Sequence, residues 1–394
     1  MFVMNHLPPK SYLWALGLGL VSTATAFTAH AQTTYTSDQT DVDIQTSATD
    51  SITVDASANN VTILNNASGT NNGSAVLLND ATAVSNTLTL TSNPGAGVAT
   101  VTSSAGAGAT VEASEAAVIT LNRVSVLSKT LGSAGAISTS ANLTVVNDGT
   151  ISVTGGTGTN VVDILGGITE ITNAASGTIT GTGGSITDII QVGATGTLSL
   201  TNLGTISSGN SGAVVIDASA SGATVGTFVN SGAITADSNS DVAINISGDT
   251  AANTIALQDG ASVVGGIVLG GTAADTISID GTVTTDGAIT GDSSVGGNLD
   301  VNSDFTFGGS SNAITDITSI DVADGATFTL GNNTITTASS GQDIALTGAG
   351  TTDITGLTGT AIDTGAGTLT ISATHTLSTD SAAVIDGIMQ INGE

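Results

Sequence analysis

Apolar and polar positions alternate along the chain in short runs, and one phrase returns four times between residues 145 and 237. The copies read VVNDGTISV from Val145, ITNAASGTITG from Ile171, LTNLGTISSG from Leu200 and FVNSGAITAD from Phe228. In each copy an apolar residue precedes an Asn, a Gly follows, and a second apolar residue stands two positions after that Gly. The successive Asn residues are 26, 29 and 28 positions apart.

A second apolar run separates the copies. These runs are VVDI from Val161, TDIIQV from Thr187, AVVID from Ala213 and VAINI from Val242. The unit is therefore three short β-type runs with turn residues between them, repeated about every 28 residues. No helical period persists and Pro is scarce, so the pattern predicts an all-β chain of stacked coils, a β-solenoid, rather than a globule.

The repeated asparagines are the predicted structural feature of this solenoid. Coils stacked about 4.8 Å apart pair every backbone group with the coils on either side, and the Val, Ile and Leu side chains point inward. Asn147, Asn173, Asn202 and Asn230 should then stack at one corner, each amide bonding the next. The Gly after each Asn is expected to take a positive φ at the turn out of that corner.

The same period extends beyond the four clear copies. Residues 32–60 are expected to form an N-terminal cap or first coil, and residues 61–394 the solenoid repeats, clearest over 145–290. After Asn230 the Asn position is predicted to pass to Asp259 and Asp280, and from about Gly291 the unit shortens. The segment LNRVSVLSKTLG from Leu121 is predicted to form a helical turn or a side loop. An antiparallel sandwich of short strands is the alternative fold.

Residues 1–31 have the features of a secretory signal peptide. Lys10 ends a short basic region, an apolar stretch runs from Tyr12 to Val21, and Ala29-His30-Ala31 forms an A-x-A cleavage motif. The apolar stretch is too short to span a bilayer. The sequence therefore predicts export, to the cell surface, the outer membrane or the medium.

Composition narrows the partners of the chain. Its net charge is −29, because it has only three Lys and Arg against 32 Asp and Glu, and it contains no Cys. Such a chain should repel nucleic acid, and its stability cannot rest on disulfides. With 39% hydrophobic residues in a periodic pattern, the chain has the composition of a folded protein rather than of a disordered one.

The phrases VNDGTISV, TNLGTISS and VNSGAITA, together with DITSIDVADGATFTL, resemble the passenger repeats of bacterial autotransporters (type V secretion). The resemblance covers residues 60–390. It implies a right-handed parallel β-helix acting as a stalk or adhesin, whose ligand lies on a host-cell, matrix or neighbouring-cell surface. It also implies an outer-membrane translocator barrel as a partner. The aromatic-poor C-terminal half departs from the strands of such a barrel, so we expect none within this chain.

Catalytic chemistry has little support in the sequence. Asp321 with Asp324 is a candidate acid pair, but this spacing is common in acidic turns. After the leader only Arg123 and Lys129 remain as cations and His375 as the single His. A Ser–His triad is thereby excluded and a polysaccharide-cleaving site disfavoured. We predict that the chain is not an enzyme, and the alternative is a secreted carbohydrate-active β-helix enzyme.

Metal binding is likewise disfavoured. Four aspartates suggest calcium, and Gly270-Gly271 with Asp275 is a fragment of a calcium-binding nonapeptide. The four are Asp286, Asp292, Asp300 and Asp304. Solvated acidic turns explain them as well, and one His without Cys argues against zinc. No cofactor and no metal is predicted.

Thr-x-Thr runs are the last candidate feature. TLTLT from Thr87, TITGT from Thr178 and TLTIS from Thr368 resemble flat Thr faces that bind ice on some solenoids. Thr also suits β-strands in general. Because these runs do not recur in register at every coil of the sequence pattern, we do not predict ice binding.

Overall fold

The computed structural model describes seven short strands before residue 104 and almost all of the chain after residue 108. The described residues are 33–35, 52–54, 60–63, 67–69, 76–78, 86–90, 100–103 and 109–391, the last range without 123–124, 131, 310, 338, 358 and 381. All regular structure within them is β-strand, which confirms the predicted all-β solenoid. These residues accordingly contain no helix that is long and apolar enough to cross a membrane.

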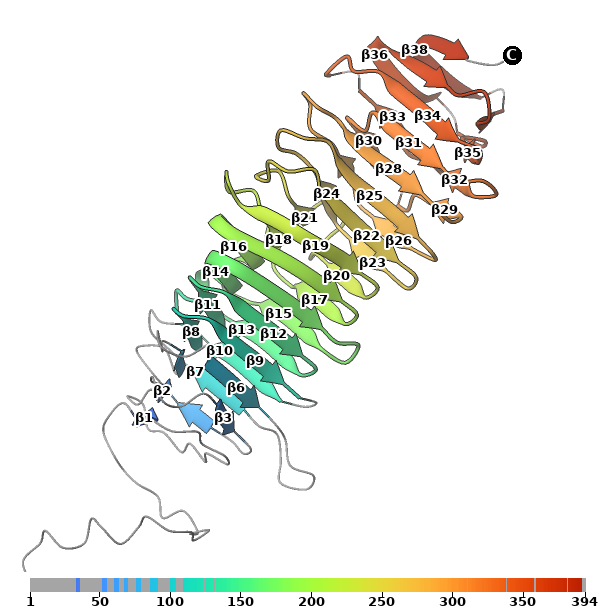
Figure 1. Ribbon diagram of the computed structural model, residues 1–394. Coiled ribbons are helices and arrows are strands. Elements are labelled where there is room, and N and C mark those ends of the chain that lie inside the picture. Colours follow the sequence, from blue (N-terminus) through green and yellow to red (C-terminus); the bar gives the residue numbers. More distant parts are fainter. Residues whose placement is uncertain are drawn as a thin grey trace, which may run out of the picture.

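The strands stack into an elongated rod (Figure 1). Each coil runs through three faces, and the strands of one face pair with their equivalents in neighbouring coils. We call these faces first, second and third in the order in which the chain passes through them.

The first face stacks the strands that come first in each coil. In order, these are β1 (Thr33–Tyr35), β2 (Ile52–Val54), β5 (Val76–Leu78), β8 (Val111–Ala113), β11 (Ile137–Thr139), β18 (Val214–Asp217), β21 (Val242–Asn245), β24 (Gly266–Val268), β27 (Ile289–Thr290), β30 (Ala313–Thr315) and β33 (Thr334–Thr336). Four longer strands run through both the first and the second face. They are β14 (Thr157–Asn173), β16 (Ser185–Asn202), β36 (Gly359–Ile371) and β38 (Ala383–Ile391).

The second and third faces follow along each coil. The second contains β3 (Asn60–Ile63), β6 (Asn86–Leu90), β9 (Ala117–Leu121), β12 (Leu143–Asn147), β19 (Thr224–Asn230), β22 (Thr254–Gln258), β25 (Asp275–Asp280), β28 (Gly297–Val301), β31 (Ser319–Val322) and β34 (Ile344–Gly348). The third contains β4 (Ala67–Gly69), β7 (Thr100–Ser103), β10 (Val126–Thr130), β13 (Thr150–Thr154), β15 (Thr178–Thr182), β17 (Thr205–Ser208), β20 (Ala233–Thr235), β23 (Ser262–Val264) and β26 (Thr284–Asp286). A separate sheet continues it with β29 (Phe305–Thr306), β32 (Thr327–Thr329), β35 (Thr351–Asp353) and β37 (Thr376–Ser378).

All pairings between these strands are parallel. In the described residues the only antiparallel contact is the isolated bridge between Asp292 and Gly296, inside a turn. Parallel pairs require a long connection between partners, and here the remaining two sides of the coil provide it. The antiparallel sandwich is therefore wrong.

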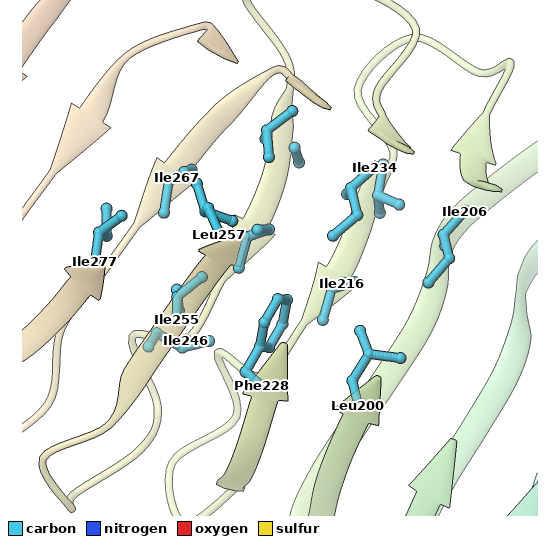
Figure 2. Close-up of a cluster of buried hydrophobic side chains, with 14 of the residues drawn as sticks. Leu200, Ile206, Ile216, Phe228, Ile234, Ile246, Ile255, Leu257, Ile267 and Ile277 are labelled. Atoms are coloured by element: carbon cyan, nitrogen blue, oxygen red, sulfur yellow. The ribbon is translucent and has the colours of Figure 1, made fainter. Parts of the chain in front are cut away.

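The core is a set of apolar rows along the axis of the rod. Figure 2 shows one part, in which Leu200, Phe228, Ile255 and Ile277 follow one another on the second face, and all four are buried. Phe305 and Phe328 stack in the same way on the third face, with ring centroids 5.8 Å apart. Alternate residues of each short strand point inward, so the sequence pattern of period two determines these rows.

Coil length varies along the rod. Side-chain bonds between neighbouring coils join residues 26, 29 and 28 positions apart in the Asn repeats, but only 22 apart between Asn253 and Asp275. A bond from Thr318 to Gly297 spans 21 positions, whereas one from Thr368 to Asp343 spans 25. The predicted shortening therefore begins before Gly291, and the later coils lengthen again. The turns absorb these differences, since the strands stay paired.

The segment from Leu121 does not form the predicted helical turn or side loop. Val126–Thr130 is strand β10 of the third face, paired with β7 and β13 in continuous register. Leu127 and Lys129 point inward and are buried, with Ser128 on the outer side. The alternation was present in the sequence, but the charge of Lys129 hid it, because a Lys at an inward position is rare.

Two sequence predictions concern the beginning of the chain. The signal peptide, residues 1–31, lies outside the described residues. Within the segment proposed as a cap or first coil, β1 and β2 pair with each other, and β2 pairs with β5 of the following coil.

Candidate functional site

The four repeated asparagines meet at one corner between the second and third faces. Asn147 Nδ2 donates to Asn173 Oδ1 at 2.8 Å, Asn173 Nδ2 to Asn202 Oδ1 at 2.8 Å, and Asn202 Nδ2 to Asn230 Oδ1 at 2.7 Å. All four side chains are fully buried. We call this row the Asn ladder.

Backbone groups complete the hydrogen bonding of the ladder. At one end Asn147 Oδ1 accepts the Gly149 N–H at 3.1 Å, and at the other Asn230 Nδ2 donates to the Gly232 carbonyl at 3.1 Å. The internal amides also donate to carbonyls of the next coil, as Asn202 does to Ala233 at 3.2 Å. The row therefore satisfies its own donors and acceptors, as a buried polar network must, and presents no group to a ligand.

The glycine after each Asn does not have the predicted role. Gly149, Gly177, Gly204 and Gly232 are absent from the positive-φ residues. They are needed because the coils approach closely at this corner: a β-carbon on Gly204 would stand 2.2 Å from the Gly177 carbonyl oxygen. On Gly232 it would stand 2.2 Å from the Gly204 oxygen. Absence of a side chain, not left-handed backbone, selects Gly here.

The ladder ends where apolar residues occupy its position. Leu121 precedes Asn147 in register, and Leu257 follows Asn230, with Ile279 after it. The prediction that Asp259 and Asp280 continue the row is thus wrong. Asp259 lies two positions further on and accepts the Thr282 N–H, while Asp280 is aligned with Gln258.

The third face presents rows of hydroxyl side chains to solvent. Strands β13, β15 and β17 place Thr150, Thr178 and Thr205 in one row. A second row two residues along contains Ser128, Ser152, Thr180, Ser207 and Thr235. A shorter third row contains Thr130, Thr154 and Thr182. We call these positions, from β10 to β23, the hydroxyl face.

The Thr-x-Thr runs do not recur at every coil, but TITGT has equivalents in register in the two neighbouring coils. The TIS of β13, the TIT of β15 and the TIS of β17 align because they belong to the Asn phrase itself, and Ala233 of β20 ends the Thr row. The runs from Thr87 and Thr368 lie in β6 and β36 and belong to the second face. The sequence alone does not show that these two runs belong to a different face from TITGT, and comparison with them therefore concealed the alignment of β13, β15 and β17.

Aspartates gather on the first face. Asp163, Gln191 and Asp217 share one outward row on β14, β16 and β18, and Asp188 lies beside them, nearly buried. Burial is the largest cause that raises the pKa of Asp188, to about 7, and the charges of Asp217 and, to a lesser degree, Asp163 act in the same direction. The hydrogen bond that the Val214 N–H donates to this carboxylate lowers the pKa, but by less. We call Asp163, Asp188 and Asp217 the acidic patch.

The aspartates considered for calcium serve separate turns. Asp292 accepts the Ser294 hydroxyl and the N–H groups of Ser294 and Val295, and these bonds lower its pKa, the hydroxyl most of all. Asp304 accepts the Thr327 N–H at 2.9 Å. Asp275 is fully buried and accepts the N–H groups of Asn253 and Gly270 at 2.8 and 3.2 Å. Within the described residues no three His, Cys, Asp or Glu side chains are grouped to hold a metal ion.

Two more of these aspartates lie on strands. Asp286 ends β26 and accepts an exposed bond from Asn239, whereas Asp300 lies on β28, in register with Asp321 of β31. Burial and the charge of Asp321 raise the pKa of Asp300. Asp321 therefore has Asp300 as its strand neighbour, and Asp324 lies beyond the end of β31, so the structure does not make Asp321 and Asp324 a strand pair.

Lys129 and His375, the remaining ionisable candidates within the described residues, lie in coils far apart along the rod. Arg123 lies outside the described residues, and Lys129 is buried in the core, where desolvation lowers its pKa. His375 faces the Thr347 carbonyl with Nδ1 at 2.9 Å and the Thr352 hydroxyl with Nε2 at 3.0 Å. The carbonyl fixes the tautomer with the proton on Nδ1, and burial lowers the His375 pKa.

Comparison with protein-family models found no matching family, and comparisons with curated proteins and with solved structures found no match either.

Proposed function

We propose that this chain is an exported β-solenoid that acts at the cell surface or outside the cell as a structural stalk or adhesin of autotransporter-passenger type. One observation supports this best: parallel coils stack in register into a rod whose outer rows repeat from coil to coil. Such a rod holds a surface at a distance and presents the same weak contact many times, which is the condition for multivalent adhesion.

The composition agrees with this role. An excess of acidic over basic side chains gives the net charge of −29, and such a charge favours the solubility of an exposed rod. The phrases that resemble autotransporter passengers are the same segments that build the Asn ladder and the hydroxyl face. The resemblance therefore rests on residues with a definite structural task.

Export is tested by processing and surface exposure. The full chain, carrying a C-terminal epitope, is produced in a Gram-negative host, and intact cells and medium are probed with antibody and external protease. We expect a mature chain that begins at Gln32 and is protease-accessible outside the cell. Replacing Ala29 and Ala31 with Arg should block cleavage, whereas His30→Gln, at the unconstrained middle position of the motif, should not. An unprocessed chain that stays in the cytoplasm contradicts the proposal.

The acidic patch favours one alternative, a secreted carbohydrate-active enzyme. A carboxyl group with a pKa near 7 beside a second carboxyl group is the arrangement that general acid catalysis of glycoside cleavage uses. The test measures turnover of neutral and acidic polysaccharides by the full chain and by Asp188→Asn and Asp217→Asn. Turnover that both substitutions abolish would support the enzyme over the scaffold. Lys129→Gln is a poor test, because Lys129 is buried.

A further inference from the structure

The hydroxyl face is the most regular surface of the described part of the rod. None of its strand pairs from β7 to β26 contains a register shift, whereas pairs on the other faces do, at β14–β16, β16–β19 and β21–β24. Equivalent outward positions therefore repeat along the rod without interruption at the spacing of neighbouring strands, and hydroxyl side chains occupy five successive strands, β10 to β20, in the row that contains Thr180.

Sheet geometry sets both periods of this surface. Neighbouring strands lie about 4.8 Å apart, and alternate residues of one strand lie about 6.7 Å apart. From β10 to β20 the row that contains Thr180 extends about 19 Å along the rod, and at β13 and β15, where all three rows hold hydroxyl groups, the face is about 13 Å wide. A rectangular array with these repeats is close to the spacing of oxygen rows on faces of hexagonal ice.

Five hydroxyl groups of this face are available to water. Among the described residues, no protein group hydrogen-bonds the side-chain hydroxyls of Thr150, Ser152, Thr178, Thr205 or Thr235, all of which are half-buried. Ser207 Oγ bonds Thr180 Oγ1 directly, at 3.1 Å, which shows that the hydroxyls of neighbouring coils lie within one hydrogen bond of each other. Each hydroxyl offers one donor and two acceptor sites. Fixed strands and the stiff χ1 of Thr hold these sites in place, so little order is lost when water binds.

Charge is excluded from this face, although the chain is strongly acidic. The outward positions of β10, β13, β15, β17, β20 and β23 hold only Thr, Ser, Val and Ala, and the first acid in these rows is Asp286 of β26. A charged group orders its own hydration shell and competes with an extended water network. Exclusion of charge therefore favours ordered water over a charged macromolecule as the occupant.

We propose that the hydroxyl face binds the surface of ice. Water molecules held by the rows at both periods would continue the ice lattice, and the threonine methyl groups between them would fill its hollows. The function goes beyond the scaffold role, since a rod of equal stability can have or lack such a face. Aromatic side chains, on which sugar rings stack, do not occur in these rows, which disfavours a polysaccharide as the ligand.

The test measures ice recrystallisation by the purified full chain at micromolar concentration, and the binding of fluorescently labelled chain to a growing ice crystal. We expect slowed recrystallisation and labelling of defined crystal faces. Thr180→Tyr, at the centre of the face, should raise the concentration needed for half-maximal inhibition at least tenfold. Thr201→Tyr is the matched control, because Thr201 is also an outward, half-buried strand residue but belongs to the second face.

Each outcome decides for or against the proposal. Equal unfolding midpoints for both Tyr variants show that folding is not the cause, and Thr180→Val, which keeps shape and removes a hydroxyl, provides a second variant if Thr180→Tyr misfolds. No inhibition by the unmodified chain overturns the proposal, as does an equal loss in Thr180→Tyr and Thr201→Tyr. A dimer that Thr180→Tyr dissociates also overturns it, since the face would then bind a second copy. The assay uses purified protein, so its result is independent of the export experiment.

Discussion

Gly177 lies so close to Asn173 that a β-carbon placed on Gly177 would stand 2.3 Å from the Asn173 Oδ1 atom. The same hypothetical carbon would stand 2.3 Å from the Asn147 carbonyl oxygen. The Asn ladder and the glycines beside it are thus one device: the amides bond from coil to coil, and the missing side chains let the coils approach closely enough for those bonds. This explains why Asn and Gly recur together in the phrase.

The ladder should contribute to stability rather than to binding. Asn202→Leu removes the acceptor of Asn173 and the donor of Asn230, two buried groups that keep only their backbone partners. We expect a loss of about 1–3 kcal/mol in the free energy of unfolding, measured by urea denaturation. Asn230→Leu should cost a similar amount.

Asn239→Leu is the matched control for these variants. Asn239 is exposed and bonds Asp286 only at the surface, so its replacement should change stability by no more than about 0.5 kcal/mol. An Asn202→Leu, Asn230→Leu double variant with an unchanged midpoint would contradict the ladder's role. Loss of adhesion at full stability would indicate a binding function instead.

The close approach of neighbouring coils at the Asn ladder leads to a second prediction, which concerns Gly204. Gly204→Ala should destabilise the rod by about 1–3 kcal/mol, because its β-carbon would meet backbone oxygens. Asn tolerates a positive φ better than Ala does, but φ of Gly204 is not positive. Asn should therefore be tolerated no better than Ala at this position. At Gly212, where φ is 78° and no atom lies within 4 Å of a β-carbon, Asn should be better tolerated than Ala. Rescue by Asn at Gly204 would restore the explanation by φ.

The fold was predictable because its determinants are local and repeated. Apolar alternation gives strands, the recurrent Asn and Gly give the corner, and a period of about 28 residues leaves stacking as the way to bury the apolar side. The role of Gly204 was not predictable, since turn φ and coil contact select the same residue type. The strand around Lys129 was not predicted, because a charged residue at an inward position breaks the apolar alternation. The shared register of β13, β15 and β17 was not predicted either, because turns of unequal length separate these strands in the sequence.

The acidic patch makes stability depend on pH. The pKa of Asp188 is about 7 in the folded rod and near its ordinary value in the unfolded chain, so the protonated form stabilises the fold. This contribution is fully present below about pH 4 and is lost as the pH rises through about 7. Its size should be on the order of 2 kcal/mol, about half of what the full pKa shift corresponds to, because the carboxyl keeps some contact with solvent.

Two substitutions check this dependence with urea midpoints measured from pH 4 to 8. Asp188→Asn should remove this part of the pH dependence and make the rod more stable than the unmodified chain above pH 7. Asp217→Asn keeps an oxygen for the Ser219 N–H but removes the neighbouring charge, so the loss of stability should move to lower pH. If Asp188→Asn retains the full pH dependence, the effect has another origin.

The final prediction separates a scaffold from an enzyme by removing one coil. Asn202 and Asn230 occupy equivalent positions 28 residues apart, so deletion of residues 202–229 joins Thr201 to Asn230 and lets Asn173 bond the latter. Each coil contacts only its neighbours, so the shortened chain should fold into a rod about 4.8 Å shorter, measurable by small-angle scattering.

Deletion of residues 202–228 is the control, because it joins Thr201 to Val229, which places Val229 at the inward ladder position beside Asn173 and turns Asn230 outward. That chain should unfold at a lower urea concentration than the in-register deletion, because it loses the ladder bond that Asn173 makes. Adhesion to cells or matrix should then fall only gradually in the in-register deletion, as one of many equivalent contacts is lost. An enzyme that uses Asp188 with Asp217 would lose all turnover, since this deletion removes Asp217. A folded, shortened rod that has lost adhesion entirely would therefore argue for one localised site and against the stalk.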